Sequence, residues 1–243
     1  MNKPMPTLTP KEWAARKSLL SKIPHFTPPP GGYSLLYPDC PWQYRDKANS
    51  GDRGAGHKYA TLSLLELKMM RPEIDRISAE NSTLVLWATA PMIREALDLM
   101  EAWGYSYSTI ALTWIKTYPV SERMKRIAKK LQVDADILES LFKDEDLTVM
   151  KARIGMGNFT RSNAEFALLG TRGKVVRENA GVCSVIVSEV REHSQKPDEA
   201  RDALVKLLGD VPRLEMFSRA STPGWDCWGL EAGKFDESEE AAC

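Results

Sequence analysis

Short apolar runs alternate with helical patterns along this chain, and the alternation restricts the fold more than any other feature. Residues 83–88 form a continuous apolar run, as expected of a central parallel strand. A helical pattern follows, with Pro91 at its start and Gly104 at its end. Residues 109–115 are the next expected strand. This order predicts an α/β fold with a doubly wound, mostly parallel sheet and helices on both of its faces.

Length and composition suit one large domain with an elaboration. The chain has 243 residues, of which 43% are hydrophobic, and this is enough for a sizeable core. Its formal net charge is zero, so any contact with nucleic acid must use a local basic patch. The sequence has no apolar run long enough to cross a membrane and no signal-peptide pattern, so we expect a cytoplasmic protein without a membrane partner.

Cysteine usage argues against two kinds of site. The four cysteines show no Cys-x-x-Cys pairing and no nearby run of histidines; they are Cys40, Cys183, Cys227 and Cys243. Neither a disulfide framework nor a metal site is therefore expected.

Both ends of the chain differ from its middle. Thr9, Pro10 and Glu12 combine a capping box with proline at the first helical position, which predicts a helix to about residue 22. A Pro- and Gly-rich linker at residues 28–32 follows. We therefore expect an N-terminal helix and linker over 1–32, one domain over 33–231, and an acidic, disordered tail over 232–243.

The end of the first expected strand carries the first candidate site. Residues 34–37 look like a short buried strand that the following prolines stop, so Asp39 lies where the strand ends and the chain turns. In an open α/β sheet, ligands bind just outside the carboxyl ends of the strands. A carboxylate there, followed by the rigid Pro41 and the broad ring of Trp42, suits a planar substrate with an amino group.

A long polar segment follows this turn. Residues 43–58 contain three glycines and no apolar period, and a loop of this length is usually either disordered or functional. We interpret it as a gate over the site at Asp39. A helix is expected over residues 63–70, directly after it.

Residues 118–154 interrupt the alternation of strands and helices. Two helical stretches are expected there, at 121–131 and 134–142, as a helical hairpin. The first is rich in cations, namely Arg123, Lys125, Arg126, Lys129 and Lys130, whereas Asp144, Glu145 and Asp146 oppose them further on. Such a run is either a solvated face or a surface for nucleic acid, and the hairpin could instead form the interface of a homodimer.

A second candidate site precedes the last expected helix. Strands are expected at residues 166–169, 185–187 and 213–217, and Pro197 opens a helix that Gly209 ends. Lys196 would then occupy the cap position, where a cation faces the positive end of the helix dipole. An anion shared by Lys196 and the free backbone N–H groups would compensate for this charge. A mobile surface lysine is the alternative.

Several motifs together resemble the MT-A70 family of adenine N6-methyltransferases. Four of them occur in the family's order: Asp-Cys-Pro-Trp at 39–42, a Gly-rich segment with Arg161 and Glu165 at 155–173, Ser-x-Lys-Pro-Asp-Glu at 194–199, and Glu-Met-Phe-Ser-Arg at 215–219. A Tyr-x-Thr-hydrophobic-Ser step at Tyr59 is also similar. Cys40 replaces the first proline of the family's motif, and Leu230 replaces an asparagine of its Trp…Gly-Asn ending.

The resemblance implies a Rossmann-like methyltransferase fold that is permuted, so that the catalytic motif precedes the cofactor strand. It implies S-adenosylmethionine as cofactor and adenine in nucleic acid as substrate, with DNA favoured over RNA. The implied catalytic residues are Asp39, Cys40, Pro41 and Trp42. The implied cofactor-binding residues are Asp39, Lys196, Glu215, Phe217, Arg219 and Glu231, with Lys196 on the methionine carboxylate. The implied substrate-binding residues are Tyr59, Arg161 and Glu165.

The chemistry of adenine suits this set of residues. The N6 lone pair is delocalised into the ring, and the Asp39 carboxylate and the Cys40 carbonyl would localise it by accepting both N–H bonds. Pro41 and Trp42 would stack on the base. The open alternatives are an enzyme for RNA adenine or cytosine N4, and a catalytically silent subunit that only binds nucleic acid. Silent family members lack the aspartate and the lysine, whereas Asp39 and Lys196 are both present.

Overall fold

The computed structural model describes residue 9 and residues 27–43, 61–118, 120–134, 160–191 and 195–229, together with 232, 233 and 236. Several expectations concern residues outside these ranges. They are the helix before residue 22, nearly all of the gate loop with Tyr59, the second helix of the insertion, the glycines at 155–157, Leu230, Glu231 and most of the acidic tail. These expectations stay predictions, as do the three domain boundaries.

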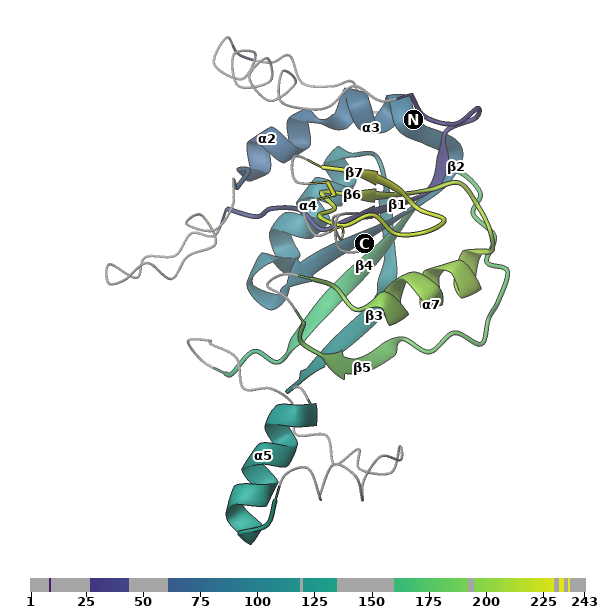
Figure 1. Ribbon diagram of the computed structural model, residues 1–243. Helices are drawn as coiled ribbons and strands as arrows, with labels where there is room; N and C mark the ends of the chain where they lie inside the picture. The colour runs from purple at the N-terminus through teal and green to yellow at the C-terminus, as the bar shows by residue number, and fades with distance from the viewer. Residues whose placement is uncertain are drawn as a thin grey trace, which may run out of the picture.

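Seven strands form one sheet in the described part of the chain (Figure 1). They are β1 (Tyr33–Pro38), β2 (Ser78–Thr89), β3 (Ser106–Thr117), β4 (Ala164–Arg172), β5 (Val185–Glu189), β6 (Arg213–Met216) and β7 (Asp226–Trp228). Their order across the sheet is β5-β3-β4-β2-β1-β6-β7. Each expected strand is present, and several extend beyond the bounds expected from apolar residues alone.

All strands of the sheet except β4 run in the same direction. β1 pairs in parallel with β2 and β6, β6 with β7, and β3 with β5, whereas β4 is antiparallel to both β2 and β3. The expected mostly parallel sheet is therefore confirmed. The carboxyl ends of β1, β3, β5 and β6 consequently lie at one edge of the sheet, together with the amino end of β4.

The order of the strands also confirms the permuted arrangement. β1 pairs with β6 from Leu35 opposite Arg213 to Pro38 opposite Met216. The strand that leads into Asp39 comes first in the sequence, yet it lies beside the strand that leads into Phe217. Two segments that the chain separates widely therefore end side by side at the same edge.

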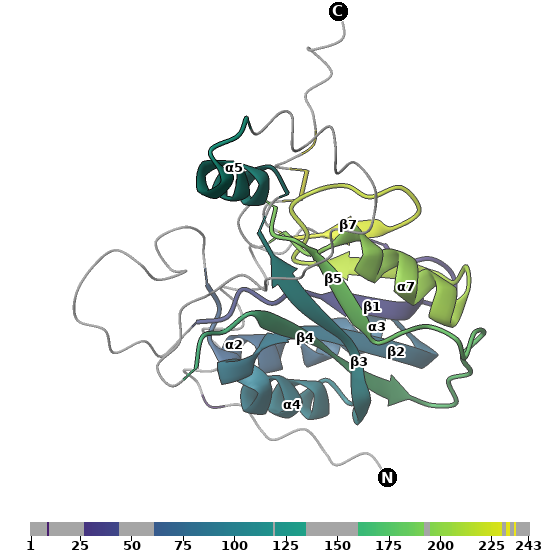
Figure 2. The ribbon, with the colours of Figure 1, turned by 90° about the horizontal axis from the view of Figure 1, so that it is seen from below.

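Helices cover both faces of the sheet (Figures 1 and 2). α2 (Leu64–Met69), α3 (Arg71–Ile77) and α4 (Ile93–Ala102) pack on one face, and α7 (Asp198–Leu208) packs on the other. Side chains of β1 alternate between the two cores, since Leu36 belongs to the first and Leu35 and Tyr37 to the second. These apolar layers on both faces hold the strand ends that form the candidate site.

The helix after the gate loop begins with a complete capping box. The Ser63 hydroxyl accepts the Glu66 backbone N–H at 3.3 Å, and the Glu66 carboxylate accepts the Ser63 backbone N–H at 2.8 Å. The expected helix over 63–70 is confirmed, but α3 after it was not expected. It starts with a proline in its first turn, where the missing N–H needs no partner.

The insertion leaves the sheet as a helix. α5 (Val120–Leu131) follows the carboxyl end of β3 and projects away from the sheet (Figures 1 and 2). The first expected helix of the insertion is thus confirmed. In the described residues, no helix combines the length and apolar character needed to span a bilayer.

Candidate active site

Asp39 lies directly after β1, at the edge where the parallel strands end. Its backbone N–H donates to the carbonyl of Met216 at 3.2 Å, which ties the turn after β1 to the end of β6. Its side chain is 29% exposed. The carboxylate is therefore held between two strand ends but can still be reached from solvent.

The Asp39 carboxylate pairs with a buried lysine. The Lys196 ammonium lies 2.6 Å from an oxygen of Asp39 and 3.4 Å from an oxygen of Glu165, and the Lys196 side chain is only 7% exposed. Glu165 comes from the amino end of β4 and also forms an ion pair with Lys116, near the end of β3. The ends of β1, β3 and β4 and the segment before α7 thus bring two carboxylates and two ammonium groups together.

Burial and neighbouring charges shift the pKa values of Lys196, Glu165 and Asp39. Burial acts to lower the pKa of Lys196, but the charges of Asp39 and Glu165 outweigh it, so this pKa is raised. Burial likewise acts to raise the pKa of Glu165, and the ammonium groups of Lys196 and Lys116 hold it below its usual value. Burial raises the pKa of Asp39, and the Lys196 ammonium offsets only part of this rise. Lys196 is therefore the firmly charged centre of the cluster.

The expected cap role of Lys196 is wrong. Pro197, with an extended backbone at φ −65° and ψ 140°, is the N-cap of α7, and Lys196 precedes it. The first turn of α7 contains Asp198 and Glu199, so carboxylates face the positive end of the helix dipole. The compensating anions of Lys196 are side-chain carboxylates from other strands.

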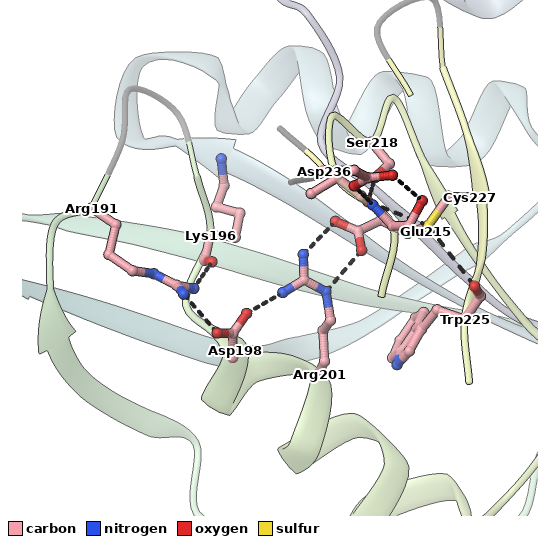
Figure 3. Close-up of polar contacts among 11 residues, drawn as sticks. Arg191, Lys196, Asp198, Arg201, Glu215, Ser218, Trp225, Cys227 and Asp236 are labelled. Carbon is pink, nitrogen blue, oxygen red and sulfur yellow. Dashed lines mark hydrogen bonds and ion pairs between the residues drawn. The ribbon is translucent and has the colours of Figure 1, made fainter. Parts of the chain in front are cut away.

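A chain of ion pairs fixes the segment that carries Lys196 (Figure 3). Glu215 of β6 accepts two hydrogen bonds of 2.8 Å from Arg201 of α7, and both side chains are 9% exposed. Arg201 also binds Asp198 at 2.6 Å, and the other oxygen of Asp198 binds Arg191 at 2.6 Å. Arg191 then donates to the backbone carbonyl of Lys196 at 2.8 Å. These contacts link the strand expected to bind cofactor to the backbone of the lysine.

Sequence reasoning missed most of this ion-pair chain. Arg191 and Arg201 were not expected at the site, and Asp198 was noted only as part of the motif at 194–199, although Asp198 and Arg201 have the i, i+3 spacing of an ion pair on one helix. Arg201 stands beside the apolar face of α7, so its burial with Glu215 could be recognised only once β6 was placed. Arg201 fixes the orientation of Glu215, whose expected cofactor contact stays a prediction.

The turn after β6 places Phe217 and Arg219 at the same edge. Phe217 adopts φ 62°, and its ring lies 5.4 Å from that of Trp228, centre to centre. Gly229 passes close to this turn, because a side-chain carbon there would lie 2.8 Å from the Ser218 carbonyl oxygen. The charge of Arg219 acts on Asp39. Both expected cofactor residues therefore adjoin the Asp39 turn.

The remaining residues of the Asp-Cys-Pro-Trp motif are mostly inside the protein. Trp42 is 4% exposed, belongs to the core under α2 and α4, and donates from its ring nitrogen to the Trp87 carbonyl at 3.3 Å. Little of its ring is left to stack on a base, so Trp42 supports the site from below. The Cys40 carbonyl accepts the Trp42 N–H at 2.8 Å and keeps one lone pair. Burial raises the pKa of the Cys40 thiol, which makes it unreactive.

The residues on either side of the expected gate loop meet beside this motif. Leu62 donates to the Pro41 carbonyl at 2.8 Å, and Gln43 donates to the Leu62 carbonyl at 3.2 Å. Arg161 is exposed just before β4, at the same edge of the sheet. Its substrate role, like that of Glu165, stays a prediction.

The charges at this edge fit the amino-acid part of S-adenosylmethionine. That part is a zwitterion, and Asp39 and Lys196 offer one carboxylate and one buried ammonium to it. The aromatic pair of Phe217 and Trp228 offers an apolar wall nearby. Among the described residues, no three His, Cys, Asp or Glu side chains are grouped to hold a metal ion.

A protein-family model matches the part of the chain that contains the sheet and the candidate site. The family model MT-A70 matches residues 33–231, from the start of β1 to beyond the end of β7. All of the described site residues lie within this match.

Several characterised proteins are similar in sequence. The type II methyltransferase M.MunI of Mycoplasma is 27% identical over 217 residues, with 82% of this chain and 77% of the relative covered. The N(6)-adenosine-methyltransferase MT-A70-like protein of Drosophila melanogaster is 24% identical, with 80% of this chain and 26% of the relative covered. The N(6)-adenosine-methyltransferase catalytic subunit METTL3 of Homo sapiens is 23% identical, with 80% and 27% covered. The chain thus spans about a quarter of the animal relatives.

Proposed function

Because this chain belongs to the MT-A70 family, we propose that it is an S-adenosylmethionine-dependent enzyme that methylates the N6 amino group of adenine in DNA. The observation that carries the proposal is the ion pair of Asp39 and Lys196 at the carboxyl edge of the sheet. This pair places the Asp39 carboxylate, which can accept hydrogen bonds from an amino group, next to the Lys196 ammonium, which can bind a carboxylate. The bacterial relative M.MunI, of which most is covered, supports DNA as substrate.

Lys196 and Asp39 have complementary roles in binding. The Lys196 ammonium holds the methionine carboxylate, and the ion-pair chain through Arg191 keeps its backbone in place. When bound, S-adenosylmethionine supplies an electrophilic methyl group on a sulfonium, whose departure is intrinsically easy. The protein therefore acts mainly by positioning the groups and excluding water.

Asp39 and Cys40 orient the amino group of the base. The Asp39 carboxylate and the free lone pair of the Cys40 carbonyl accept the two N–H bonds of N6, which localises the nitrogen lone pair toward the methyl group. Asp39 must be ionised to do this, and its partial exposure leaves room for the amino group. In a duplex the adenine must first leave the base stack, which costs on the order of a few kcal/mol.

The proposal is tested by the product. The protein is incubated with methyl-labelled S-adenosylmethionine and with pools of duplex DNA, single-stranded DNA or RNA, and the pools are digested to nucleosides. We expect label in N6-methyladenine from DNA, at a limited set of positions, because we also propose that the enzyme is site-specific. Label only in N4-methylcytosine or only in RNA would select one of the alternative substrates. An absence of label from every pool would refute the proposed activity.

A further inference from the structure

We infer that the exposed basic face of α5 binds the phosphate backbone of the substrate next to the target adenine. This inference rests on the proposed function, because it names the surface with which the enzyme would hold its nucleic acid. The evidence is the distribution of charge around the helix, the exposure of its side chains and the place where the helix leaves the sheet.

The cations of α5 share one side of the helix. With about 3.6 residues per turn, four of them fall within an arc of about 140°; these are Lys125, Arg126, Lys129 and Lys130. All four side chains are exposed. The opposite side carries Ile127, Ala128 and Leu131; Ala128 is 4% exposed, whereas Ile127 and Leu131 are 37% and 61% exposed. The helix is therefore amphipathic, and its cations point away from its apolar side.

The charge on this face is local and is not neutralised by the described residues. The helix sequence contains five cations and one carboxylate, Glu122, so its formal charge is +4 in a chain of net charge zero. No described acidic side chain forms an ion pair with the four exposed cations. Arg126 instead lies over the ring of Tyr118, 4.6 Å from its centre, at the start of the insertion. A polyanion is the partner that this charge fits.

The position of α5 brings this face to the substrate side of the protein. α5 follows β3, which ends at Thr117 at the same edge of the sheet as Asp39. The exposed Arg161 precedes β4 at this edge, and the Lys116 N–H donates to the Asn163 carbonyl at 2.9 Å, which ties the two segments together. A strand whose adenine enters the site at Asp39 would thus have its flanking phosphates near α5.

The salt dependence of binding tests the inference. Affinity for a fluorescent duplex pool of random sequence is measured between low and moderate salt, with S-adenosylhomocysteine present. Each lost phosphate contact flattens the log–log slope by about 0.9. Replacing Lys125, Arg126, Lys129 and Lys130 by alanine should therefore flatten it by about 2 to 4, while the affinity for S-adenosylhomocysteine stays unchanged.

Two double variants separate phosphate binding by α5 from a general loss of positive charge. Lys174→Ala with Arg177→Ala removes two exposed cations after β4, at the opposite edge of the sheet, and should leave the slope unchanged. Lys129→Ala with Lys130→Ala removes the same number from α5 and should flatten it. The inference would be overturned if the two double variants had equal slopes. It would also be overturned if the quadruple variant kept its slope and changed its sedimentation coefficient. A wild-type enzyme without methyltransferase activity would instead refute the proposed function.

Discussion

The ammonium group of Lys196 lies 2.6 Å from the carboxylate of Asp39, across 157 positions of sequence. The contact forms because Asp39 follows β1 and the Lys196 segment follows β5, and the carboxyl ends of these two strands lie at the same edge of the sheet. The pair is asymmetric: Lys196 is nearly buried, whereas Asp39 is partly open to solvent. This asymmetry suits a cation that holds a cofactor and a carboxylate that meets a substrate.

Replacing Lys196 by alanine should weaken S-adenosylmethionine binding more than it slows methyl transfer. One charge-assisted hydrogen bond is worth roughly 1.5–3 kcal/mol, so we expect the dissociation constant to rise roughly 10- to 150-fold. Calorimetric titration measures it. Lys68→Ala is the matched control, because Lys68 forms only an exposed ion pair with Asp98 and should leave the affinity unchanged. Equal affinities in both variants would mean that Lys196 does not contact the cofactor.

The pH profile of turnover should reflect the raised pKa of Asp39. Only the ionised carboxylate accepts the amino N–H, so kcat at saturating cofactor should fall as the pH drops through this pKa, above the range of an ordinary aspartate. Lys196 lowers the pKa of Asp39, so Lys196→Gln should move the acidic limb of the pH–kcat profile to higher pH. A limb that stays in place, or that moves to lower pH, would show that another group controls the profile.

Replacing Arg201 by methionine should destabilise the fold. The change leaves the Glu215 carboxylate buried without its partner, at a cost of about 3–5 kcal/mol. Urea unfolding measures the loss. Adding Glu215→Leu to this variant removes the unpaired charge and should recover most of the stability. If the double variant is as unstable as the single one, the buried ion pair is not the reason for the loss.

Trp42 lies in the core, whereas the sequence predicted that its ring stacks on the substrate base. Because its ring lies in the core, Trp42→Ala should cost about 3–5 kcal/mol of unfolding free energy. Trp42→Phe should retain most of the activity if the ring only supports the Asp39 turn. If the folded Trp42→Phe variant has a greatly raised KM for DNA and an unchanged KM for cofactor, the ring stacks on the substrate base.

The positions of the strands along the chain could be predicted where the apolar pattern is strong. The continuous apolar run at 83–88 and the prolines after β1 fix two strand positions locally, and the motif order implied that the catalytic strand precedes the cofactor strand; the pairing of β1 with β6 is seen only in the folded sheet. Those predictions depend on patterns within short stretches of chain. The antiparallel direction of β4 has no such local signal.

The electrostatic network at the site could not be predicted in the same way. Lys196 was identified, but its partners Asp39 and Glu165 come from other strands, and only the folded sheet brings them together. The burial of Trp42 follows similarly from α2 and α4, which cover it after the chain returns across the sheet. Long-range contacts of this kind depend on register and topology.

Single-turnover methyl transfer by the Asp39→Ala variant tests whether Asp39 is a catalytic residue. The variant is mixed with duplex DNA that the wild type methylates, at a cofactor concentration that calorimetry shows to be saturating for each protein. Because Asp39 organises the amino group in the transition state, we expect the rate to fall by about 10²-fold or more, with the fold retained. If a folded, cofactor-saturated Asp39→Ala protein keeps more than about a tenth of the wild-type rate, Asp39 is not a catalytic residue, since the loss is smaller than a positioned catalytic group supplies.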